Sequence, residues 1–102
     1  MRKCRIEVIK VSCNEELANE YGKKGVTYCG AHKLGDVFIS DGSRPEGLCG
    51  DAWTCVKQYV EKLVEGDVNF YGGEWVNREN LAIAGCNDGL TPVVFKVEGI
   101  EA

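Results

Sequence analysis

The sequence has little of what marks the commonest functional classes. It contains one histidine, and neither a Gly-x-Ser-x-Gly motif nor a phosphate-binding glycine loop occurs in it, so the usual hydrolase and nucleotide-binding signatures are excluded. No apolar run approaches the ~20 residues that span a bilayer. The start, MRKCRIEVIK, is charged throughout and does not resemble a signal peptide. We therefore expect a cytoplasmic protein without a membrane partner.

Clusters of positive charge are also missing. The net charge is −4, and the twelve lysines and arginines are scattered, with only short pairs such as Lys23 and Lys24. Phosphate contacts need a basic stripe or patch, so we expect no nucleic-acid partner. A small-molecule or protein partner and assembly into a homo-oligomer both stay open.

Length and pattern predict one domain of the α+β class. The 102 residues contain no repeat or linker, and 44% of them are apolar, which is enough for a single core over residues 1–102. The expected order is β-α-β-α-β-β, a mostly antiparallel sheet with one major helix packed on it. The aromatic segment 70–75 receives no assignment.

In the first third of the chain, the pattern predicts a strand followed by a short helix. Residues 4–11 alternate in polarity and are rich in β-branched side chains, which places Cys4 on the core side of a strand. Ser12 and Glu15 match a capping box, and the helix that they begin is expected to end at Gly22.

The rest of the chain predicts a second strand, the major helix and a hairpin. The strand covers 36–40, the helix covers 51–65 with an apolar face at helical spacing, and the hairpin strands cover 81–84 and 91–97. We expect the Asn-Asp-Gly turn at 87–89 to supply the positive φ angles of a tight hairpin.

Cysteine, in contrast, is abundant. The chain has six cysteines, at positions 4, 13, 29, 49, 55 and 86. Without an export signal, and with enough chain to build a core, metal binding or thiol chemistry is favoured over a disulfide framework, which stays an alternative. We expect Cys4 in the core, Cys13 as filler in the first helical turn, and Cys55 facing solvent or another element.

Cys49 has the most informative position. It lies between Gly47 and Gly50 at the approach to the major helix. Unpaired amide groups and the helix dipole favour a thiolate there, the form that binds metals or attacks electrophiles. The glycines allow the backbone to approach a ligand closely. Taken alone, Cys49 fits a small apolar residue buried beneath the helix equally well.

Three further residues complete a candidate metal site. Cys29 and His32 form a Cys-x-x-His pair in a loop, and Cys86 ends a strand directly before the hairpin turn. Alone, such a pair is more often a free thiol beside an exposed histidine. Together with Cys49, however, the residues make a tetrahedral Cys3His set for zinc. Three thiolates also permit an iron–sulfur cluster. We expect a zinc ion or an iron–sulfur cluster, with a metal-free protein as the alternative.

Three stretches resemble the signatures of a known family. Residues 44–53 resemble PEGxC-x-x-A-[W/F], residues 85–98 resemble C-x-D-G-L-R-P-V-V-F-K-L-E, and residues 29–38 resemble C-x-x-[G]-H-K-x-G-D-x-F. Together they are similar to a family of small prokaryotic conserved hypothetical proteins of about 90–100 residues, which has no assigned activity.

The resemblance implies that Cys29, Cys49 and Cys86 are the signature thiols and that the other cysteines are extras. His32 matches only one form of the pattern. Thr91 and Gly99 stand where arginines are usual, and a Gly-Gly-x-Phe-Pro-Trp stretch is replaced by the aromatic segment. An anion site that uses those arginines is therefore not expected here.

Three functional hypotheses follow, and whether the protein is an enzyme is left undecided. The first is binding of zinc or an iron–sulfur cluster through Cys29, Cys49 and Cys86. The second is a thiol enzyme or redox sensor with Cys49 as the reactive thiolate and Cys29 or Cys86 as its resolving partner. The third is a metal-free interaction domain in which the cysteines are structural.

Overall fold

Four antiparallel strands form one sheet in the spatial order β2-β1-β4-β3. The computed structural model describes residues 2–100. Along the described chain the elements are β1 (Lys3–Val11), α1 (Glu15–Tyr21), β2 (Val37–Ser40), α2 (Gly50–Glu65), the 3-10 turn η1 (Phe70–Gly73), β3 (Leu81–Gly85) and β4 (Val93–Ile100). The predicted α+β class, the order β-α-β-α-β-β and the antiparallel sheet are confirmed.

The long strands β1 and β4 form the centre of the sheet. Lys3 lies opposite Ile100 at one end of the pair and Val11 lies opposite Val93 at the other, with a register shift between Val8 and Lys10. The short strands β2 and β3 pair on the outer sides of this centre. The two central strands therefore set the length of the domain.

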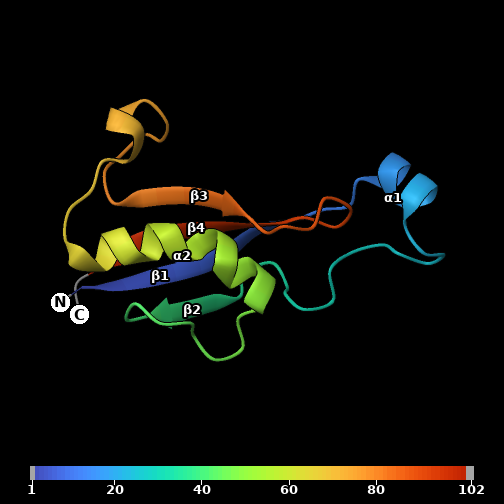
Figure 1. Ribbon diagram of the computed structural model, residues 1–102, viewed down its shortest axis with the longest axis horizontal. Helices are drawn as coiled ribbons and strands as arrows, with labels where there is room; N and C mark the ends of the chain where they lie inside the picture. Colours follow the sequence, from blue (N-terminus) through green and yellow to red (C-terminus); the bar gives the residue numbers. More distant parts are fainter. Residues whose placement is uncertain (1, 101–102) are drawn as a thin grey trace.

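The helix α2 lies across one face of the sheet, and the core is the layer between them (Figure 1). Strand side chains point to alternate faces of the sheet, so every second one points toward α2. There they pack against the apolar face of the helix, whose residues recur every three to four positions. The residues that α2 contributes to the hydrophobic core cluster are Ala52, Val56, Val60 and Leu63, and those from the strands are Cys4, Ile6, Val8, Ala82, Ala84, Val93, Phe95 and Val97. The predicted core position of Cys4 is confirmed.

The other face of the sheet carries ion pairs. Arg5 Nη1 lies 2.6 Å from Glu7 Oε1, and Lys96 Nζ lies 3.3 Å from the same oxygen. Side-chain hydrogen bonds lower the pKa of the Glu7 carboxyl. The bond from Arg5 has the largest effect, and the bond from Lys96 follows it. Because these groups are solvated, they contribute little stability, and the fold depends on the α2 side of the sheet.

The predicted capping box is wrong. The N-cap of α1 is Asn14, without a side-chain cap, and Ser12 lies before the helix. The Ser12 and Asn14 amides donate to the carbonyl oxygens of Pro92 and Leu90, so pairing with the loop before β4 sets the start of α1. The predicted helix end at Gly22 is confirmed.

The expected turn chemistry at 87–89 is also wrong. Gly89 is not among the glycines with positive φ, so the loop is not a tight turn of that type. Instead, the Asp88 carboxylate accepts bonds from the amides of Leu90 and Thr91 and from the Thr91 hydroxyl. These bonds lower the pKa of Asp88, the Thr91 hydroxyl contributing most.

Within residues 2–100, no helix has the length and apolar character needed to cross a membrane.

Candidate functional site

Cys49 lies at the start of α2 on a backbone that its neighbours hold in place. It is the N-cap of the helix, and its side chain makes no capping bond. The preceding Gly47 has φ +87°, a left-handed conformation that favours glycine. Leu48 is fully buried, and its carbonyl oxygen accepts a bond of 2.8 Å from Arg44 Nε. The backbone of Cys49 is therefore fixed while its sulfur stays available.

His32 fixes the same backbone from the other side. Its Nε2 accepts a 3.2 Å hydrogen bond from the Cys49 amide, so that nitrogen carries no proton. The ring is 4% exposed and stands edge-on to Phe38 and Phe95. The turn that follows is docked on β1, where Gly35 N–H donates to Val8 O. His32 thus orients the approach to α2.

Cys86 directly follows the last residue of β3. Its amide donates to Val93 O over 3.0 Å, and the Val93 amide donates to Cys86 Sγ over 3.3 Å. Ala82 and Ala84 lie on the buried side of β3, and the two-residue period places Cys86 on that side too. The sulfur is half-buried against the core.

The four predicted site residues line one cavity. It has a volume of about 350 Å³ and lies between the loop before β2, the start of α2 and the end of β3. Its lining residues are Cys29, His32, Cys49, Asp51, Ala52, Cys86, Asn87, Asp88 and Val93. The three thiols, separated by twenty and thirty-seven positions, therefore face a common space.

Convergence on this cavity is not the same as a formed metal centre. Over residues 2–100, no group of three or more His, Cys, Asp or Glu side chains is arranged as it would be around a metal ion. All six cysteines are free thiols. The ligand roles of Cys29, His32, Cys49 and Cys86 stay predictions.

Sequence reasoning missed the polar residues that surround the thiols. Asp51 lies in the first turn of α2 and lines the cavity together with Asn87 and Asp88. Each of these residues follows a predicted thiol by one or two positions, which is a signal that the sequence did contain. Both aspartates are exposed, and the Asp88 carboxylate accepts a hydrogen bond from the Thr91 hydroxyl.

Cys55 is predicted to face either solvent or another element, and it contacts another part of the chain. Its Sγ donates to Asn87 Oδ1 over 3.0 Å, and Asn87 Nδ2 donates to Thr54 Oγ1 over 3.1 Å. Burial raises the pKa of the Cys55 thiol, and the neighbouring Cys86 adds to that effect. A fourth sulfur therefore adjoins the cavity without lining it.

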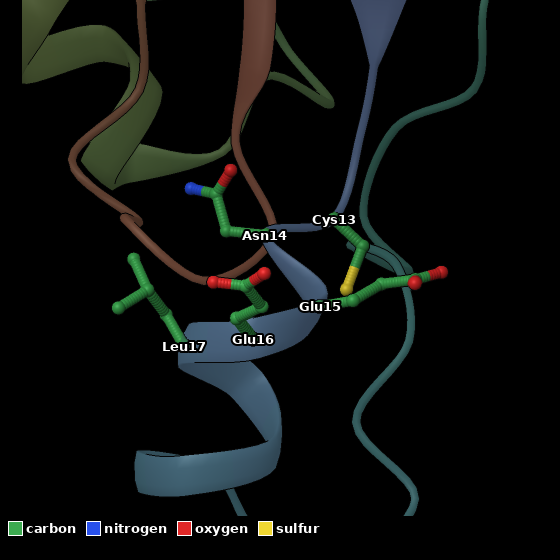
Figure 2. Close-up of a pocket in the computed structure, with 5 residues that line it drawn as sticks. All are labelled: Cys13, Asn14, Glu15, Glu16 and Leu17. Carbon is green, nitrogen blue, oxygen red and sulfur yellow. The ribbon is translucent and has the colours of Figure 1, made fainter.

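A second hollow, of about 520 Å³, lies at the start of α1. Five consecutive residues line it, and Figure 2 shows that their side chains spread apart, with Leu17 and Glu15 pointing in opposite directions. Cys13 is half-buried there and precedes the helix. The side chains do not converge, so the cavity with three thiols is the better candidate site.

In comparisons with family models, with curated proteins and with solved structures, nothing matches the chain. The resemblance of its three stretches to family signatures therefore stays a prediction.

Proposed function

We propose that the protein holds a metal centre, either a zinc ion or an iron–sulfur cluster, through the thiolates of Cys29, Cys49 and Cys86. The observation that carries the proposal is that these thiols come from three separate segments and line one cavity. Thiolates are the ligands that zinc and iron–sulfur clusters share. The resemblance to the small prokaryotic family singles out the same three cysteines. A reducing compartment such as the cytoplasm keeps them as thiols.

The fourth coordination position is where the proposal departs from a simple Cys3His set. Ligation through Nε2 of His32 would break its bond to the Cys49 amide, so we assign His32 the role of positioning Cys49. Asp51 and Asp88 are both exposed carboxylates of the cavity, and Asp88 already accepts hydrogen bonds from Leu90 and Thr91. Asp51, a water molecule or a substrate then takes the fourth position, and an open position is typical of catalytic rather than structural zinc.

Binding requires the three sulfurs to close around the metal. Each sulfur turns about one side-chain torsion, and Cys29 lies in a segment without regular secondary structure. Cys49 and Cys86 are on well-supported backbone, so movement of the Cys29 segment makes most of the adjustment. Metal binding then stabilises the folded state, because the unfolded chain has no assembled site.

Elemental analysis combined with a visible spectrum tests the proposal. Protein purified anaerobically, under reducing conditions and without chelator, should contain roughly one zinc ion per chain, or iron and sulfide with visible absorption. Cys29→Ser, Cys49→Ser and Cys86→Ser should each lose the metal. Cys13→Ser is the matched control, because Cys13 is also half-buried but lies outside the cavity. Colourless wild-type protein without stoichiometric metal would overturn the proposal.

A second candidate is thiol chemistry at Cys49. It is favoured by one observation, which is that the Cys49 side chain sits at the N-cap of a sixteen-residue helix and makes no capping bond. If the metal-free protein uses Cys49 as a nucleophile, iodoacetamide should modify Cys49 faster than Cys13 at neutral pH. Equal rates for the two half-buried thiols, measured by mass spectrometry, would overturn this second candidate. An interaction domain with structural cysteines would then remain only if the protein also binds no metal.

A further inference from the structure

Cys55 of α2 and Cys86 at the end of β3 are neighbours, since Cys55 contacts Asn87, the residue after Cys86, and Cys86 helps to raise the pKa of the Cys55 thiol. Cys86 continues the buried, helix-facing period of β3. On α2, Tyr59 follows Cys55 by one helical turn, and its ring packs on η1, in the segment that leads to β3. The stripe of α2 that contains Cys55 therefore runs along the β3 side of the sheet.

Asn87 connects the two cysteines. It follows Cys86 directly in the chain, and its side chain accepts the Cys55 thiol proton while donating to Thr54. Both bonds hold the residues after β3 against one turn of α2. Cys55 and Cys86 are each half-buried, but only Cys86 lines the cavity. Of these two thiols, Cys86 is therefore the one that a small oxidant inside the cavity can reach.

We propose that hydrogen peroxide converts Cys55 and Cys86 into a reversible disulfide, which removes Cys86 from the set of metal-binding thiols. The inference of a disulfide rests on the proximity of the two residues, whereas its effect on metal binding rests on the proposed function. The site would then bind metal in its reduced state and release it on oxidation.

The chemistry balances with peroxide as the only co-reactant. The Cys86 sulfur attacks one peroxide oxygen, the O–O bond breaks, and a sulfenic acid and one water form. The Cys55 sulfur then attacks the Cys86 sulfur, the S–O bond breaks, and the leaving hydroxide takes the Cys55 proton as a second water. The two thiols lose one electron each, and peroxide gains both. A dithiol reverses the step by thiol–disulfide exchange.

Peptide mapping of metal-free protein tests the disulfide itself. A protease that cleaves before aspartate places Cys49, Cys55 and Cys86 in separate fragments, 41–50, 51–66 and 67–87. After stoichiometric peroxide, blocking of free thiols and digestion without reductant, fragment 51–66 should be joined to 67–87. A link from 41–50 or 1–35 to 67–87, or oxidation without any disulfide, would overturn the inference.

Two variants separate this inference from the proposed function. Cys55→Ser should abolish the cross-link, whereas Cys13→Ser should keep it, and thermal unfolding checks that both fold. In metal-loaded protein, peroxide should release metal from the wild type, and a dithiol should then restore metal binding. In Cys55→Ser the sulfenic acid has no resolving thiol, so excess peroxide should carry Cys86 on to the sulfinic acid, and a dithiol should not restore binding. Equal recovery of both proteins would refute the regulatory role. If the wild type binds no metal at all, the proposed function fails, and the wild-type peptide map still decides the disulfide.

Discussion

The six thiols differ in how far the fold removes them from water. Cys4 is fully buried under α2, where its Sγ lies 3.8 Å from Val60 O. Burial raises its pKa to about 11, so it stays a neutral thiol at every pH at which the protein is handled. The five other cysteines are half-buried, so reagents distinguish Cys4 from them.

Cys4 should resist alkylation until the protein unfolds. Iodoacetamide reacts with thiolates, and Cys4 is both protonated and covered. Tandem mass spectrometry after treatment at pH about 8.5 should find Cys13 modified and Cys4 intact, and both modified in urea. Modification of Cys4 in the native protein at the rate of Cys13 would show that its burial is incorrect.

His32→Phe should destabilise the fold even though it preserves an aromatic ring. The variant keeps contacts with Phe38 and Phe95 and removes the acceptor of the Cys49 amide. An unsatisfied buried donor costs about 1–3 kcal/mol, which urea unfolding can measure. If His32 positions Cys49 and is not a ligand, metal should bind more weakly to His32→Phe but with unchanged stoichiometry. Complete loss of metal from a folded variant would favour direct ligation.

Among the elements, α2 contributes the largest share of the core and α1 contributes little. Leu63 of α2 is fully buried, whereas Leu17 of α1 is 45% exposed. Only Ala18 of α1 is buried. Since the stability of a short helix comes from packing rather than propensity, the same substitution should have different effects on the two helices.

Leu63→Ala should lower the free energy of unfolding by about 2–5 kcal/mol, because it leaves a cavity in the core. Leu17→Ala is the matched control and should change stability by no more than about 0.5 kcal/mol. Chemical denaturation of the two variants measures both values. Similar losses would mean that α1 packs against a surface, such as a second copy of the chain.

The loop between β3 and β4 should lose stability in acid because of Asp88. Its pKa lies below the ordinary value of 3.8 in the folded state, so the carboxylate stabilises the fold above that ordinary value. This contribution is lost as the pH falls through the lower folded pKa. The carboxylate is solvated, so Asp88→Ala should cost about 1 kcal/mol or less at pH ~6. The difference from the wild type should shrink as the pH falls below the ordinary value of 3.8, and a constant difference would contradict this account.

Local patterns predicted the elements, and contacts distant in sequence decided their ends. Alternation in β1 and the apolar stripe of α2 involve neighbouring residues, so the sequence alone revealed them. The start of α1 depends on bonds from Ser12 and Asn14 to residues near 90, which no local pattern shows. The bond between Cys55 and Asn87 also crosses thirty-two positions, so no local pattern predicts it.

For the whole molecule, the order of the elements explains why the candidate site could be predicted in part. The start of α2 meets the end of β3 because the helix packs across this face of the sheet, and the cavity forms there. The segment from α1 to β2 has no regular secondary structure and runs beyond the sheet and α2 (Figure 1). Its approach, which brings Cys29 and His32 to the cavity, is set by tertiary contacts.

Trypsin should cut this segment first. Lys23 and Lys24 are exposed in a stretch without helix or strand, whereas Lys57 and Lys62 are exposed on α2. Proteases cleave a chain that is locally unfolded. The stretch around Lys23 and Lys24 has no helix or strand to unfold, whereas cleavage in α2 requires the helix to open. Mass spectrometry of early fragments should show cleavage after the first pair. Early cleavage within α2 would contradict the described fold, and metal bound at Cys29 should slow the first cut.

The pairing of Lys3 with Ile100 in the centre of the sheet has a consequence for engineering. A short peptide added between the two ends would close the backbone into a ring without altering any strand partner. New ends could then be opened in the exposed stretch around Lys24. Such a circular permutant would have its termini on the segment that contains Cys29, while β1 and β4 became one continuous hairpin.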